Sequence, residues 1–259
     1  MKTLEIDKKV TQNLEKYFKL EIGKDTIACP YFINTARRKD LRALMGKGTP
    51  EEIVLETKVW AQVKGVDLYQ AHLSEIRDLM TRVGIGIDCS GFVYHGLEKY
   101  LRDKYGKGLL QILKFDNTDL RSKFARLLRP AENIGANSMT NEQNTLKVAL
   151  DQVLPGDLLR GVGERKNVYH VALVVAVDQD SKGSTRKIYY WHSHRGYGEH
   201  NGVRKGSVEI VDANLPLIAQ NWDDHGEDGI NYLLENDLKP HPEDSGFRRL
   251  KIKSLSLDE

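Results

Sequence analysis

The strongest constraint on the fold is a change in hydrophobic period along the chain. Up to the stretch LDQVLPGDLL, apolar residues recur mostly every three or four positions, as in amphipathic helices. Beyond it, short runs rich in β-branched and aromatic residues, such as HVALVVAV and KIYYWHSH, alternate with turn-forming segments. Helices first and consecutive strands later predict an α+β domain, with helices on one side of an antiparallel sheet.

Local signals predict where several elements begin and end. Residues 6–20 read as a first helix, and in GTPEEIVLETKVWAQVKG Thr49 is a suitable N-cap, Pro50 takes the first helical position and Gly65 follows the last turn. A further helix is predicted around NTDLRSKFARLLRP. The stretch AENIGANSMTNEQN reads as a loop, and the acidic segment 214–246 as a surface lid or a decorated loop.

Composition narrows the class of protein. Lys and Arg number 39 against 37 Asp and Glu, so the net charge of +2 predicts no general attraction to nucleic acid or anionic lipid. No apolar run approaches the roughly 18 residues of a membrane span, and the N-terminus lacks the apolar stretch of a signal peptide. We therefore expect a soluble chain made without a leader, either cytoplasmic or exported by a leaderless route to act outside the cell.

Cysteine usage makes one residue a candidate for chemistry. With Cys29 and Cys89 alone, neither a disulfide framework nor a four-cysteine zinc site is expected. Cys89 stands in GIGIDCSGFVYHGLEKY, where Asp88 is a suitable N-cap for a helix whose inward face includes Phe92. The positive end of the helix dipole there favours a thiolate of lowered pKa, and the free N–H groups could hold an oxyanion. Gly91 keeps the approach to the sulfur open.

A nucleophilic thiol needs a base, and the predicted strands carry candidates. His170 opens HVALVVAV, where it is either a satisfied residue at the edge of the core or a positioned base. In YYWHSH, strand alternation places His192 and His194 on one face. If a hairpin pairs His170 with this stretch, one imidazole could take the thiol proton while the other orients it.

These motifs together resemble a known family. DCSGF, LPGDLL, HVALVV and YYWHSH, in this order, are similar to the NlpC family of papain-like cysteine peptidases over roughly residues 88–212. The resemblance implies a papain-like α+β fold in which the nucleophile helix packs on an antiparallel β-sheet. It also implies that Cys89 is the nucleophile, His170 the general base and His192 the third residue, with His194 as the alternative.

The resemblance also implies substrate contacts and a domain organisation. CPYFIN is similar to the PY pair of the family, so Tyr31 is expected to line the site, together with Asp88 and Ser90 beside the cysteine. The family has only a short connection between these motifs. We therefore predict a single papain-like catalytic domain, residues 1–259, that contains an N-terminal helical insertion over residues 35–83, which could shape a substrate groove.

The function implied is that of a cysteine amidohydrolase working through an acyl-enzyme, without metal or cofactor. By resemblance the substrate would be a peptide or peptidoglycan fragment, cleaved near a γ-linked D-glutamyl residue. Three alternatives stay open at this point: a related acyltransferase, a non-catalytic binding module on the same fold, and a zinc site. That zinc site would use Cys89 and His170 with His192 or His194.

Overall fold

A large antiparallel sheet forms the centre of the molecule, as the change of period predicts. The computed structural model describes residues 1–33, 41–116, 119–165 and 167–252. Across the sheet the strand order is β4-β10-β5-β6-β7-β8-β9, and β1 pairs with β6. The strands are β1 (Lys2–Glu5), β4 (Thr145–Lys147), β5 (Leu158–Val162), β6 (Tyr169–Gln179), β7 (Thr185–His194), β8 (Gly202–Glu209), β9 (Asn221–Asp223) and β10 (Gly246–Leu250).

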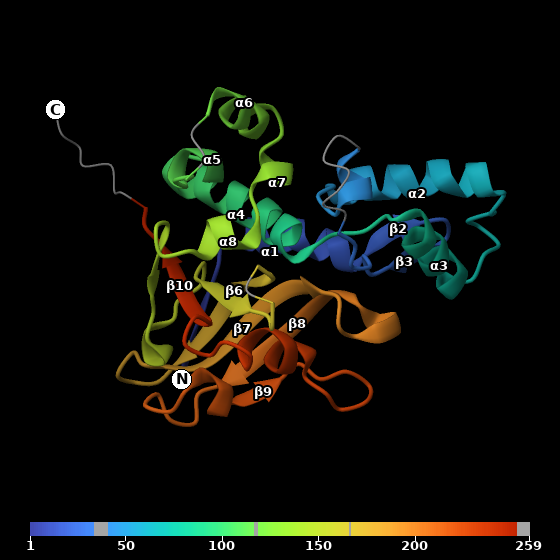
Figure 1. Ribbon diagram of the computed structural model, residues 1–259. Helices are drawn as coiled ribbons and strands as arrows, with labels where there is room; N and C mark the ends of the chain where they lie inside the picture. Colours follow the sequence, from blue (N-terminus) through green and yellow to red (C-terminus); the bar gives the residue numbers. More distant parts are fainter. Residues whose placement is uncertain (34–40, 117–118, 166, 253–259) are drawn as a thin grey trace.

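Helices cover one face of this sheet (Figure 1), so the mixed α+β class is confirmed. The longer helices are α1 (Lys8–Phe18), α2 (Pro50–Lys64), α3 (Leu73–Val83), α4 (Cys89–Tyr105) and α6 (Leu120–Leu128). Shorter helices are α5 (Leu109–Ile112), α7 (Pro130–Asn133) and α8 (Ala136–Thr140), and a hairpin joins β2 (Leu20–Ile22) to β3 (Asp25–Ile27). Single turns are η1 (Arg42–Met45), η2 (Leu150–Gln152), η3 (Gly198–His200), η4 (Leu217–Ala219) and the π-helical η5 (Leu234–Leu238).

The core has two layers, one on each face of the sheet. Leu14 of α1 and Phe92 of α4 pack with Leu173 of β6 on the helical face. On the other face, Val174 packs with the C-terminal segment, which contributes Leu233 among others. Because successive side chains of a strand point to opposite faces, β6 is apolar on both of its faces.

The start of α2 matches its sequence signals closely. The Thr49 hydroxyl accepts from the backbone N–H of Glu52, whose carboxylate accepts from the N–H of Thr49, and Pro50 opens the helix. Gly65 ends it with a φ of 70°. Part of the predicted insertion, residues 35–40, lies outside the described residues. The rest comprises η1, α2 and α3, and their side chains join the buried cluster that contains α4.

Two sequence interpretations differ from the structure. The stretch AENIGANSMTNEQN is not an open loop, because it forms most of α7 and all of α8. Both helices are too short to show a repeating apolar period. The acidic segment 214–246 is also more ordered than a decorated loop, since it contributes η4, β9 and η5. Within the described ranges, no helix is long and apolar enough to cross a bilayer.

Candidate active site

Cys89 is the first residue of α4, as its position after Asp88 predicts. The Asp88 carboxylate accepts from the backbone N–H of Gly91 at 2.5 Å and so caps the helix. The Cys89 side chain is 6 % exposed, and its Sγ lies 3.9 Å from the carbonyl oxygen of Tyr169 on β6. The sulfur therefore sits between the start of α4 and the start of a central strand.

The ionisation of Cys89 differs from the expectation. Burial is the main cause that raises the pKa of its thiol, to about 12, and the Asp88 carboxylate adds to the increase, while the Lys47 ammonium opposes it. The helix dipole, on which the sequence interpretation relied, acts against a desolvation cost that only the packing reveals. Cys89 is thus a thiol of raised pKa, and not the thiolate that the sequence predicts.

His170 lines the same cavity as that thiol and belongs to a relay of hydrogen bonds. Its Nε2 is 2.9 Å from Nδ1 of His192, and Nε2 of His192 is 3.0 Å from an oxygen of Asp224. All three side chains are buried. The structure therefore brings His170 and His192 side by side, with His192 rather than His194 in hydrogen-bond contact with His170.

If Asp224 is ionised, the hydrogen bonds of the relay determine which ring nitrogen of His192 and of His170 carries the proton. The carboxylate can only accept, so His192 carries its proton on Nε2 and leaves Nδ1 as an acceptor. His170 then donates from Nε2, and its Nδ1 keeps a lone pair. Burial, together with the neighbouring imidazoles His194 and His192, holds the pKa of His170 well below its usual value. Among the described residues His170 is therefore an imidazole that donates from Nε2 and whose Nδ1 has no hydrogen-bond partner.

Asp224 is held in the ionised state by two partners. Burial alone would raise its pKa, but the interactions with His192 and with Arg204 outweigh burial and hold the pKa at about 2. Nε of Arg204 lies 2.9 Å from Oδ1 of Asp224, and its guanidinium stacks 3.5 Å from the ring of Tyr197. The sequence interpretation placed Asp224 in an acidic segment without a role and missed it.

Cys89 and His170 both line one cavity of about 530 Å³, which lies beside the first residues of β6. Alternation gives His170 the face of Ala172, whereas Val171 faces α4. The thiol and the imidazole therefore reach the cavity from opposite faces of the strand. Polar residues of α7 and α8, such as Asn133 and Asn137, form part of its wall, so the stretch misread as a loop contributes to the site.

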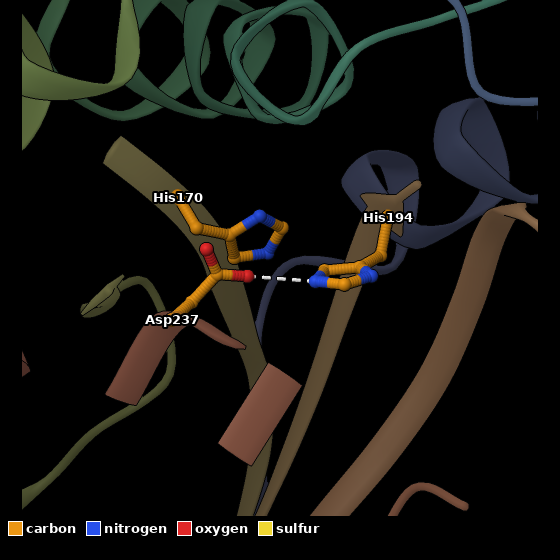
Figure 2. Close-up of side chains that lie close together, drawn as sticks. All are labelled: His170, His194 and Asp237. Carbon is orange, nitrogen blue, oxygen red and sulfur yellow. Dashed lines mark hydrogen bonds and ion pairs between the residues drawn. The ribbon is translucent and has the colours of Figure 1, made fainter. Parts of the chain in front are cut away.

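His194 forms a second histidine–carboxylate pair beside the relay. Figure 2 shows His170 and His194 projecting from neighbouring strands toward Asp237, whose Oδ2 lies 2.7 Å from Nε2 of His194. The backbone N–H of Gly196 donates to Nδ1 of His194 at 2.9 Å. His194 therefore carries its proton on Nε2 and donates it to Asp237. Asp237, supplied by η5, was another residue that the sequence interpretation missed.

The same three residues bear on the zinc alternative. His170, His194 and Asp237 offer ligand atoms that all lie within 4.8 Å of one another, whereas the predicted zinc set contained Cys89 and no aspartate. A metal on Nε2 of His194 would move that proton to Nδ1, toward which the N–H of Gly196 already points. The hydrogen bonds therefore favour a protein-only pair over a metal centre here.

The expected substrate-binding residues all line the cavity, but two of them already have partners. Nζ of Lys47 lies 2.9 Å from Oδ1 of Asp88 and also donates to the hydroxyl of Ser90. Burial raises the pKa of Tyr31 well above its usual value, so its hydroxyl remains a hydrogen-bond donor. Tyr31 is thus placed to contact a substrate, whereas Asp88 and Ser90 are engaged within the protein.

Comparison with known proteins gives this chain no relatives. No family model matches it, no curated protein matches it and no solved structure matches it. The likeness to the NlpC family therefore remains a resemblance in motif order, and function has to be argued from the geometry of the site.

Proposed function

We propose that this protein is a cysteine hydrolase of papain-like architecture that acts on amide bonds. The observation that supports it most is the relay from Asp224 through His192 to His170, which leaves a basic nitrogen on a histidine that lines the cavity of Cys89. A merely structural histidine at the edge of a core would need one partner and no shared cavity with a cysteine. The nucleophile, the base and the residue that orients the base are therefore all present.

The reaction begins when Sγ of Cys89 attacks an amide carbonyl carbon while its proton passes to Nδ1 of His170. The N–H groups of Cys89 and Ser90, which precede the N–H of Gly91 that Asp88 caps, stabilise the oxyanion of the tetrahedral intermediate. His170 then gives the proton to the leaving amine as the C–N bond breaks. His192 stabilises the imidazolium, because its own Nε2–H is held by ionised Asp224.

Hydrolysis of the acyl-enzyme repeats these steps with water. His170 takes a proton from the water as its oxygen bonds to the acyl carbon, and the C–S bond breaks as the proton returns to sulfur. An amine that replaces water would make the same machinery an acyltransferase. The resemblance suggests a peptide or peptidoglycan fragment, cleaved near a γ-linked D-glutamyl residue, and an exposed site of action at the cell wall.

The test is incubation of the protein with a panel of muropeptides, followed by mass analysis of the products. We expect cleavage by the wild type and by Cys29→Ala, which removes the other thiol, and none by Cys89→Ala. Rapid denaturation during turnover should trap the acyl group on Cys89. Turnover that survives Cys89→Ala would overturn the proposal.

A metal-dependent hydrolase is the second candidate, favoured by the cluster of His170, His194 and Asp237. Metal analysis of the purified protein separates the two proposals. The cysteine mechanism predicts substoichiometric metal and activity that survives a chelator. One bound zinc per chain, lost together with activity, would transfer the assignment to the metal.

A further inference from the structure

The loop after η1 is joined to the turn that carries the nucleophile. The backbone N–H of Asp88 donates to the carbonyl oxygen of Gly46 at 2.9 Å, and Lys47 forms an isolated antiparallel bridge with Ile87. A Cβ on Gly91 would lie 2.4 Å from the same Gly46 oxygen. Glycine at position 91 therefore makes room for this loop, in addition to leaving space near the sulfur.

Through this contact the buried ammonium group of Lys47 reaches Asp88 and Ser90, the two residues that flank Cys89. Lys47 is 7 % exposed, and its Nζ donates to Oδ1 of Asp88 at 2.9 Å and to Oγ of Ser90. Its main chain is also fixed, since Nε2 of His95 lies 2.9 Å from the Lys47 carbonyl oxygen. Lysine is rarely buried to this extent unless a partner compensates its charge.

The charges of Asp88 and Lys47 act on the sulfur in opposite directions. The Asp88 carboxylate accepts from Lys47 and from the N–H of Gly91, but a negative carboxylate next to Cys89 disfavours a thiolate. An ammonium paired with that carboxylate cancels much of its field. In a site sheltered from water such contributions are larger than at the surface.

We propose that Lys47 is a positioning residue, which neutralises Asp88 so that this carboxylate can cap α4 without opposing negative charge on the sulfur of Cys89. The insertion then has a chemical role, because it supplies the cation that the nucleophile turn requires. This role matters for catalysis only if the proposed function holds. The thiol chemistry itself can be measured without a substrate.

Other charged and titratable groups also surround the thiol and are common to every variant below. The Asp237 carboxylate also raises the pKa of Cys89. A thiolate at Cys89 would raise the pKa of Tyr31. The remaining ones that line the cavity are Glu132, Tyr169, His170, His194 and Arg195. Because these stay constant, a change confined to position 47 or 88 reports on the pair.

The experiment follows the alkylation of Cys89 by iodoacetamide from pH 6 to pH 10, with the labelled residue identified by peptide mass. We expect Lys47→Met to slow alkylation at least about tenfold at each pH below the thiol pKa, equivalent to a rise of one pKa unit. Lys47→Arg should stay within about threefold of the wild type. Asp88→Asn should accelerate alkylation, because it removes the negative charge beside the sulfur. Asparagine still caps helices, so the start of α4 should be kept.

A double substitution separates charge from shape. Lys47→Met combined with Asp88→Asn removes both charges, so its alkylation profile should return toward that of the wild type. Fully buried Cys29 serves as an internal reporter, because its labelling would reveal unfolding. If Lys47→Met unfolds by this criterion, Asp88→Asn alone decides, and the absence of acceleration overturns the proposal.

Two further results would also overturn it: an unchanged profile in folded Lys47→Met, or a double variant as slow as the single one. These failures are distinct from failure of the proposed function. A shifted alkylation profile without any muropeptide cleavage would support the role of Lys47 and count against the peptidase. Muropeptide cleavage with an unshifted alkylation profile would support the peptidase and count against the role of Lys47.

Discussion

Two histidine–aspartate pairs lie two residues apart on the same face of β7, and their roles differ. His192 is fully buried with Asp224, whereas His194 lines the cavity with Asp237. Nδ1 of His192 faces the imidazole of His170, and Nδ1 of His194 accepts from the Gly196 main chain. The comparison teaches that the partner of the second ring nitrogen, and not the aspartate, decides which histidine belongs to the relay.

The largest expected effect comes from removing one histidine at a time. His192→Ala should lower kcat/KM by about 10³-fold, because it leaves the tautomer of His170 unspecified. His194→Ala should lower it by about tenfold or less, and mainly through KM, since His194 only shapes the cavity wall. Steady-state kinetics on the cleaved muropeptide measures both. A larger loss for His194→Ala would reverse the assignment of the two pairs.

The buried ion pair at Asp224 should be stronger than a surface ion pair on the segment that carries Asp237. Arg204→Met leaves the buried Asp224 carboxylate with His192 and the Tyr190 hydroxyl, and we expect a loss of about 3 kcal/mol in the free energy of unfolding. The matched control is Lys239→Met on the segment of Asp237, since Lys239 pairs with Glu235 at the surface. That change should cost less than about 1 kcal/mol in urea denaturation. Equal losses of unfolding free energy in Arg204→Met and Lys239→Met would contradict this difference in strength.

Stability should fall in mildly acid solution because of the relay. Burial is the main cause that lowers the pKa values of His170 and His192, so below pH 6.5 the unfolded chain binds more protons at these two residues than the folded protein does. When the unfolded state binds more protons, the free energy of unfolding falls as pH falls. Each such histidine contributes a slope of up to about 1.4 kcal/mol per pH unit.

Denaturation at pH 7, 6 and 5 measures this slope, and His192→Gln should reduce it by about one histidine's share. A free energy of unfolding that stays constant from pH 6.5 to pH 5 would mean that the relay is protonated in the folded protein. The Asp224 pKa of about 2 acts in a lower window. Its contribution is present above pH 3.8 and is lost as the pH falls toward 2.

Sequence reasoning could predict the parts of this site that depend on local pattern. The N-cap at Asp88 is read from a few adjacent residues, and alternation within one strand places His192 and His194 on one face. The contact with His170 then needs only a hairpin between neighbouring strands, which the turn-forming segment between them indicates. These predictions are therefore confirmed where the structure describes the residues.

The parts that the sequence did not predict depend on distant contacts. Asp224 and Asp237 lie 32 and 43 residues beyond their histidines, in a segment without a periodic pattern. Lys47 meets Asp88 across 41 residues and a loop that only tertiary packing positions. The ionisation of Cys89 was misjudged for a related reason, because desolvation depends on what covers the thiol. An aspartate-rich stretch after a histidine-rich strand was the only available signal.

The smallest expected effect concerns the approach of η5 to the sheet, which positions only the second pair. A Cβ on Gly161 would lie 2.8 Å from Cβ of Asp237, closer than real Cβ atoms approach, whereas one on Gly163 would find its nearest neighbour, Val168, at 3.3 Å. Gly161→Ala should therefore destabilise the fold by about 1–3 kcal/mol as η5 shifts, and Gly163→Ala by less. The same Cβ would lie 3.3 Å from Cβ of His170, so Gly161→Ala should disturb the cavity wall at Asp237 first and the relay less. A rise in KM with a nearly unchanged kcat would support this separation, and a loss confined to kcat would show that Asp237 acts on the relay after all.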